Sequence, residues 1–176
     1  STNGQTYWSD TNQLGAYLPN YAQKIRDQIG GDESSLIISE IYVPRPDLPD
    51  FLAQAADLLR SNSTTVIYGT VRLIEKDDES FLAWAKQPYA CIIFNLLTFH
   101  TPAGMEGSAR SFRGLIDLAI ARSGSYYLTY HKFAKPEQVL ACYPQFKEFL
   151  ALKQRYDSTE RFQSEWYRYY RKLFPS

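Results

Sequence analysis

The residues of this chain that could do chemistry lie in short alternating stretches that are typical of β-strands. In the stretch 64–74, strict alternation places Val66, Tyr68, Thr70 and Arg72 on one side of the chain. The residues that alternate with them would face the packed helices: Ile67, Gly69, Val71 and Leu73. An arginine is costly to bury alone, so Arg72 needs a carboxylate, a ligand anion or water. These side chains predict a sheet face that can bind an anionic or hydroxylated ligand.

Polar residues of the other predicted strands would join Arg72 on this face. They are Glu40, Tyr42, Asn95, Tyr130 and Lys132. His131 would point the opposite way unless the end of its strand twists. A second interpretation is that these side chains simply cover the solvent side of an open sheet, with Glu40 and Arg72 as a structural ion pair.

The hydrophobic pattern predicts strands and helices in a regular order. Strands are expected over 36–43, 64–74, 89–99 and 125–133, and amphipathic helices over 48–59 and 109–120. The third strand is apolar along nearly its whole length, which indicates burial on both faces. A further helix over 19–29 and a helical turn over 80–86 are expected as well.

This order, βαββαβ, predicts an α+β fold of the ferredoxin-like type, with one antiparallel sheet and both helices on one face. Three parts are expected along the chain. Residues 1–34 form a linker and lead-in helix, residues 35–134 form the ferredoxin-like domain, and residues 135–176 form a helical C-terminal tail.

Composition excludes several classes of function. The 19 basic and 19 acidic residues balance, so nothing indicates a nucleic-acid partner. No apolar run reaches the length of a membrane span, and no signal peptide is visible. Cys91 and Cys142 have the apolar neighbours of buried free thiols, which favours a cytoplasmic location. His100 and His131 lack metal-ligand spacing, so no metal is expected.

Several stretches together resemble a known enzyme family. They are IYGTVRLIEKDD (67–78), YHKF (130–133), CYPQF (142–146) and YDSTERFQSEWY (156–167), with QTYWSDT (5–11) as a linker. Their order and spacing are similar to the C-terminal part of bacterial FAD-linked oxidoreductases of the vanillyl-alcohol-oxidase type. Among the branches of that family, the aldonolactone and alditol oxidases are the most similar.

The resemblance implies an FAD-dependent oxidoreductase, of which this chain would be the substrate or cap domain. An N-terminal domain of the same protein would bind FAD, the sheet would cover the flavin, and this chain alone would be inactive. The tail, with aromatic residues such as Phe162 and Trp166, would pack on the FAD domain. The small-molecule substrate would give a hydride to the flavin.

The resemblance also implies roles for individual residues. Arg72 and Lys132 would be catalytic, because their charges stabilise a substrate oxygen or the reduced flavin. Substrate-binding residues would be Tyr68, Thr70, Asn95, Tyr130 and His131. The alditol-oxidase pattern has a glutamate two residues before the arginine, where this chain has Thr70. This departure argues for a different substrate within the same reaction class.

Two other functions compete with the oxidoreductase. A stand-alone ferredoxin-like regulatory domain would bind a small molecule and fold freely without a partner domain. An RNA-binding module has the same element order, but the neutral charge and the absence of its aromatic motif argue against it.

Overall fold

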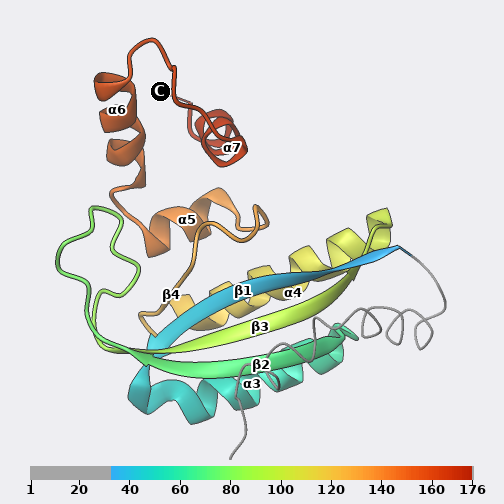
Figure 1. The fold of residues 1–176 in the computed structure, drawn as a ribbon. Coiled ribbons are helices and arrows are strands. Elements are labelled where there is room, and N and C mark those ends of the chain that lie inside the picture. Colours follow the sequence, from blue (N-terminus) through green and yellow to red (C-terminus); the bar gives the residue numbers. More distant parts are fainter. Residues whose placement is uncertain (1–32, 176) are drawn as a thin grey trace, which may run out of the picture. The chain divides into compact units, whose positions relative to one another are not determined.

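The computed structural model describes residues 33–175, and residues 35–176 belong to one compact unit. Its elements follow one another along the chain as shown in Figure 1. They are β1 (Ser34–Pro44), the 3-10 helix η2 (Arg45–Asp47), α3 (Leu48–Ser61), β2 (Val66–Ile74), β3 (Tyr89–Phe99), α4 (Pro102–Ile120), β4 (Ser125–Tyr126), α5 (Pro136–Cys142), α6 (Phe146–Tyr156) and α7 (Glu165–Leu173). The helix expected over 19–29 and the linker motif lie outside the described residues.

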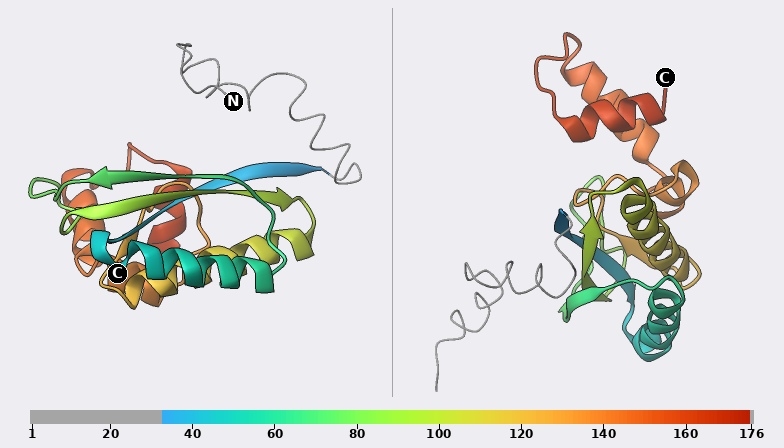
Figure 2. Two further views of the ribbon diagram at one scale, coloured as in Figure 1. Left: turned by 90° about the horizontal axis from the view of Figure 1, so that it is seen from below. Right: turned by 90° about the vertical axis from the view of Figure 1, so that its right-hand side faces the viewer.

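The fold is α+β, built on a four-stranded antiparallel sheet with the strand order β2-β3-β1-β4. β2 and β3 pair from Ile74 opposite Tyr89 to Val66 opposite Leu96. β1 and β4 pair only at two positions, Ile41 with Tyr126 and Tyr42 with Ser125. Figure 2 shows α3 and α4 side by side against the same face of the sheet, as the sequence predicts.

The central strand β3 is buried along its length, which confirms the expectation drawn from its apolar sequence. Ala90, Ile92, Phe94 and Leu96 pack in the core on the helix side, and Tyr89, Cys91 and Ile93 belong to a second cluster on the other face. On the helix side, Phe51 of α3 meets Phe94 with ring centroids 6.4 Å apart. Phe51, Ala55 and Leu59 form the buried stripe of α3.

The edge strand β2 departs from the predicted pattern in two ways. Val71 and Leu73 lie on the helix side by their pairing, yet they are 45% and 66% exposed because the helices do not cover this edge. A bulge between Val66 and Tyr68 shifts the register, so Val66 lies on the helix side. Its predicted place beside Tyr68 and Arg72 is therefore wrong.

The last strand is much shorter than the predicted 125–133. The backbone N–H of Tyr127 still donates to the Glu40 carbonyl (3.0 Å), but the chain then turns away. Side chains of the tail bond to this segment: Tyr143 Oη donates to the Tyr126 carbonyl, and Trp166 Nε1 donates to the Leu128 carbonyl (3.0 Å). Because alternate carbonyls of an antiparallel strand point away from its neighbour, these bonds connect the outer edge of β4 and of the following segment to the tail.

The segment 80–86 contains no helix, and its expected helical turn is wrong. Asp77 Oδ1 instead accepts hydrogen bonds from the backbone N–H groups of Glu79 and Ser80, both at 3.0 Å. Asp77 also donates its own N–H to the Ala85 carbonyl (2.8 Å), which closes the loop. An aspartate that bonds nearby N–H groups favours a turn over a helix.

The helical tail belongs to the same compact unit as the sheet. Most of its aromatic side chains pack in the domain's own core, among them Phe146, Tyr167, Tyr170 and Phe174. Tyr156 and Phe162 are different, because 81% and 79% of their surfaces are exposed. Most of the tail aromatics thus complete the core of this unit.

A test of this packing is available at Gly124, which connects α4 to β4. A Cβ atom there would lie 2.2 Å from the Tyr42 carbonyl oxygen and 2.8 Å from that of Ala119. Because backbone atoms must then move, we expect Gly124→Ala to lower the free energy of unfolding by about 2–3 kcal/mol in urea denaturation. Gly107 of α4 is the control, since no atom lies within 4 Å of an added Cβ.

Gly107→Ala should raise the free energy of unfolding by about 0.5–1 kcal/mol, because alanine favours a helix more than glycine does. Equal effects of the two substitutions would contradict the close approach of α4, β4 and β1 at Gly124.

Candidate functional site

The sheet face opposite α3 and α4, called here the far face, carries most of the predicted polar residues. Cross-strand pairing places Tyr68 beside Asn95, Thr70 beside Ile93 and Arg72 beside Cys91. The far-face residues that matter for the site are Glu40, Tyr42, Tyr68, Thr70, Arg72, Cys91, Asn95 and Tyr130. The predicted matching of faces between β1, β2 and β3 is therefore confirmed.

Glu40 of β1 is the acceptor at the centre of this group. Its Oε2 accepts hydrogen bonds from Tyr42 Oη (2.7 Å) and from the Cys91 thiol (3.5 Å). Its Oε1 accepts one from Tyr130 Oη (3.1 Å). Three donors from β1, β3 and the segment after β4 thus converge on one half-buried carboxylate.

Burial and the Glu40 charge keep these donors protonated. Burial, followed by the charge of Glu40, raises the pKa of the Cys91 thiol to about 12. The same two causes raise the pKa values of Tyr42 and Tyr130 above the ordinary value of a phenol. The thiol and both phenols therefore remain donors to Glu40 at neutral pH, and Cys91 is not a nucleophile.

Arg72 lies near this cluster but takes no part in its hydrogen bonds. Its positive charge acts on Cys91 and Tyr130, where it lowers the pKa against the larger effect of burial. Within the described part of the chain, Arg72 forms no ion pair, with Glu40 or with any other carboxylate. The ion pair proposed as a structural explanation for Glu40 and Arg72 is thus absent, and the guanidinium is exposed.

Part of the far face is covered by the loop between β2 and β3. Trp84 of that loop packs on Tyr42, with ring centroids 5.3 Å apart, and near Tyr127 at 6.3 Å. Tyr42, Tyr89 and Cys91 are buried in this cluster. A ligand can therefore reach the Glu40 cluster only from the side of Tyr130 and Arg72, which are exposed.

A hollow of about 510 Å³ lies beside Tyr130, at the edge of β1 that the short β4 leaves unpaired. Its lining consists of Leu36, Ile37, Ile38, Thr129, Tyr130, His131, Lys132 and Phe133. This volume is within the range of small-molecule sites. The apolar wall comes from β1, and the polar groups come from the segment after β4.

Asn95 is a second polar group of interest on the far face. Only 2% of its surface is exposed, and its Oδ1 accepts no hydrogen bond from the described residues. A buried acceptor without a donor is unfavourable. Asn95 Oδ1 is therefore an acceptor without a donor among the described residues, and its role in substrate binding stays a prediction.

Two predicted site residues, His131 and Lys132, line the hollow but take no part in the Glu40 cluster. His131 is buried on the helix side, where its Nε2 lies 3.1 Å from Ser39 Oγ and its ring stacks on Phe112 at 4.4 Å. Lys132 turns toward the tail, with its Nζ 5.5 Å from the centre of the Tyr169 ring. Neither side chain contacts Glu40 or Arg72, because the chain leaves the sheet after β4.

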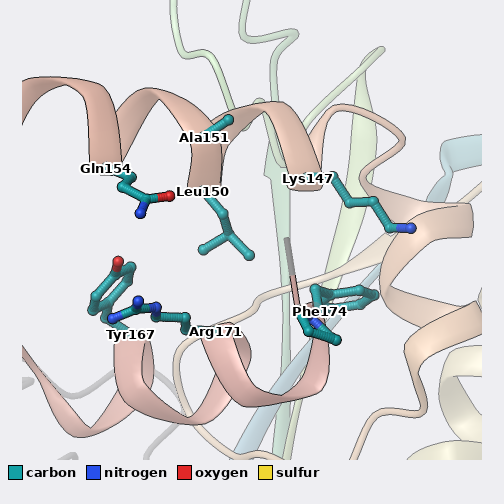
Figure 3. A pocket seen from close by; sticks show the side chains of 8 residues that line it. Lys147, Leu150, Ala151, Gln154, Tyr167, Arg171 and Phe174 are labelled. Carbon is teal, nitrogen blue, oxygen red and sulfur yellow. The ribbon is translucent and has the colours of Figure 1, made fainter. Parts of the chain in front are cut away.

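A separate small pocket lies between α6 and α7 (Figure 3), with a volume of about 110 Å³. Leu150, Tyr167 and Phe174 form its wall, and Arg171 at its rim pairs with Glu160. This volume is too small for a substrate of ordinary size. The far face and its hollow are therefore the better candidate.

Comparison with models of protein families gives no match, and comparison with curated proteins gives no significant similarity. Among the described residues, no cluster of histidine, cysteine and carboxylate side chains could hold a metal ion. No helix in the described part of the chain is long and apolar enough to cross a membrane. The far face, with the Glu40 cluster and the exposed Arg72, is therefore the basis for a functional proposal.

The buried position of His131 gives a pH test of this assignment of faces. Burial lowers the pKa of its imidazole from 6.5 to about 4, so the folded protein keeps it neutral. The unfolded chain therefore binds a proton at His131 at a higher pH than the folded protein does. The stability contributed by the neutral imidazole is fully present above about pH 6.5. As pH falls from 6.5 toward 4, the free energy of unfolding should decrease by about 3 kcal/mol.

His131→Gln, which stays neutral, should show a correspondingly weaker pH dependence in urea denaturation between pH 7 and 4. The carboxylates contribute equally to both proteins, so the difference isolates His131. Parallel curves for the two proteins would place His131 in contact with water and contradict its burial.

Proposed function

We propose that this chain is the C-terminal substrate domain of an FAD-dependent oxidoreductase of the vanillyl-alcohol-oxidase type. In this proposal the far face covers the flavin and orients a small hydroxylated or anionic substrate. The observation that carries the proposal is the exposed guanidinium of Arg72, which lacks an ion pair beside the Glu40 cluster. A solvated positive charge beside fixed hydrogen-bonding groups is typical of an anion-binding site.

The proposal includes a ferredoxin-like fold. The chain order βαββαβ supports it. The sheet order, taken from the other edge as β4-β1-β3-β2, supports it as well, because a βαββαβ chain with this antiparallel order has both crossover helices on one face.

When bound, FAD would supply the hydride acceptor, and a domain outside this chain would hold most of it. The residues of this chain would position the substrate. Arg72 would hold an anionic group or stabilise negative charge that develops on an oxygen. Tyr130, Thr70 and Asn95 would orient the substrate by hydrogen bonds. Lys132 is bound to the tail by Tyr169, so the electrostatic role rests on Arg72.

A stand-alone regulatory domain that binds a small molecule is the second candidate. One observation favours it: the tail aromatics are part of the domain's own core, as in a unit that folds by itself. Such a domain would bind its ligand at the same hollow, but it would need no flavin.

The test of the first candidate is Arg72→Ala in the full-length protein that contains this chain. We expect the rate of flavin reduction by substrate to fall by about 100-fold or more, as when a positioned electrostatic group is lost. Arg110→Ala is the matched control, because Arg110 is exposed on α4, away from the far face. An unchanged rate in Arg72→Ala would contradict the catalytic role of Arg72. A full-length protein without flavin would contradict the oxidoreductase and leave the regulatory domain as the remaining candidate.

A further inference from the structure

We propose that β2 pairs along its free edge with β2 of a second copy of this chain, antiparallel and around a two-fold axis at Thr70. The surface involved, called here the β2 edge, consists of the outer side of β2 (Val66–Ile74) and the neighbouring Leu52 of α3. This inference goes beyond the proposed function, because the pairing needs neither flavin nor substrate. It follows from the exposure, the sequence and the charges of β2.

The first step concerns the backbone of β2, which is the last strand of the sheet. Among the described strands it pairs with β3 alone, and its other edge is open. Proteins usually protect such an edge with a lysine, a proline, a bulge or a very short strand. β2 has nine residues and contains neither lysine nor proline. Its bulge lies near its start, between Val66 and Tyr68, so the rest of the edge is open to another strand.

The second step concerns apolar side chains that gather along this edge. Leu52, Val66, Val71 and Leu73 are 38%, 41%, 45% and 66% exposed. α3 runs along β2 (Figure 1), and a hollow of about 320 Å³, lined by Leu52 and Val66 among other residues, lies between them. Apolar side chains that stay exposed along one open edge indicate a protein interface. The β2 edge therefore needs an apolar cover.

The third step concerns the fit of β2 to its own copy. A two-fold axis presents the same residues from both sides, so each apolar group meets another surface of the same kind. With Thr70 opposite Thr70 of the second copy, Val71 lies opposite Gly69 on the helix side. Gly69 has no side chain, so Val71 of the second copy has space there. Pairing centred on Thr70 thus suits the sequence of the strand.

The fourth step concerns Arg72, the only charged residue of β2. In this register Arg72 lies opposite the uncharged Tyr68 of the second copy. The two Arg72 residues are then four positions apart along the paired strands, which is about 13 Å. This separation exceeds the Debye length of about 8 Å at physiological ionic strength, so their repulsion is screened. A register centred on Arg72 itself would bring the two charges together.

The fifth step concerns the charges at the two ends of β2, which are already paired within one copy. Arg45 pairs with Glu75 beside the C-terminal end, and Arg60 pairs with Asp57 beside the N-terminal end, both at 2.6 Å. An antiparallel pair brings these balanced ends together without opposing like charges. The β2 edge therefore matches a neutral apolar surface such as its own copy better than a strongly charged partner.

The size of the surface sets the expected affinity. Nine residues of strand span about 30 Å, and the strand edge with the adjoining side of α3 is about 15–20 Å wide. Two copies would therefore bury about 1,000 Å², which is at the lower limit for a specific interface. The structure thus predicts a reversible dimer of moderate affinity.

The experiment measures association by sedimentation equilibrium of the full-length protein that contains this chain. We expect a monomer–dimer equilibrium with a dissociation constant below about 100 μM. Val71→Lys should weaken association at least tenfold, because an exposed lysine on an edge strand opposes pairing with another strand. Met105→Lys on α4 is the matched control, since Met105 is 39% exposed and lies away from β2.

A second variant tests the register. Cα atoms directly opposite each other in an antiparallel pair are about 4.5–5.5 Å apart, a distance that a disulfide can bridge. Thr70→Cys should therefore form an intermolecular disulfide on mild oxidation, and the added Val71→Lys substitution should prevent it. Thr129→Cys, at an exposed position after β4, is the control. Cys91 and Cys142 are buried free thiols and should not cross-link.

A protein that stays monomeric at all concentrations would overturn this inference, and so would a dimer that Val71→Lys leaves unchanged. A monomer that loses FAD on Val71→Lys would place another domain of the same protein on the β2 edge, which also contradicts a second copy. Flavin content is measured in the same samples. A colourless dimer sensitive to Val71→Lys would support this inference while contradicting the oxidoreductase, and a monomeric flavoprotein would do the opposite.

Discussion

The complete burial of β3 is the constraint on which the rest of this structure depends. A strand buried on both faces needs two separate covers. On one face α3 and α4 provide the cover. On the other face it comes from Tyr42 and from Trp84 in the loop that precedes β3. Polar groups that must reach a ligand are consequently displaced from the middle of β3 to its neighbours, to Arg72 on β2 and Glu40 on β1.

The two charged groups are held in different ways. Glu40 lies against buried donors, and the high pKa values of these donors keep the hydrogen bonds intact at neutral pH. Arg72 lies on an edge strand, where water solvates its charge at little cost. Because the two groups form no ion pair with each other, the proposed site would leave both of them available to a ligand that carries complementary groups.

Much of this could be predicted from local pattern. Alternation gave the far-face positions of Tyr68, Thr70 and Arg72, and the apolar run gave the buried β3. The bulge that turns Val66 to the helix side has no signal in an alternating sequence. The segment after β4 is bound by Tyr143 and Trp166 of the tail, and such contacts between distant segments are not encoded in local alternation. Lys132 in the same segment lies against Tyr169 of the tail. Alternation predicts the face of Glu40, but not its three hydrogen bonds, because their donors come from separate segments.

A visible absorption spectrum would decide whether the far face belongs to a flavoprotein. The sample is the full-length protein that contains this chain, purified, incubated with FAD and desalted. We expect the absorption bands of bound oxidised flavin in that protein and none in residues 1–176 alone. A full-length protein that stays colourless after this treatment would show that the far face does not cover a flavin.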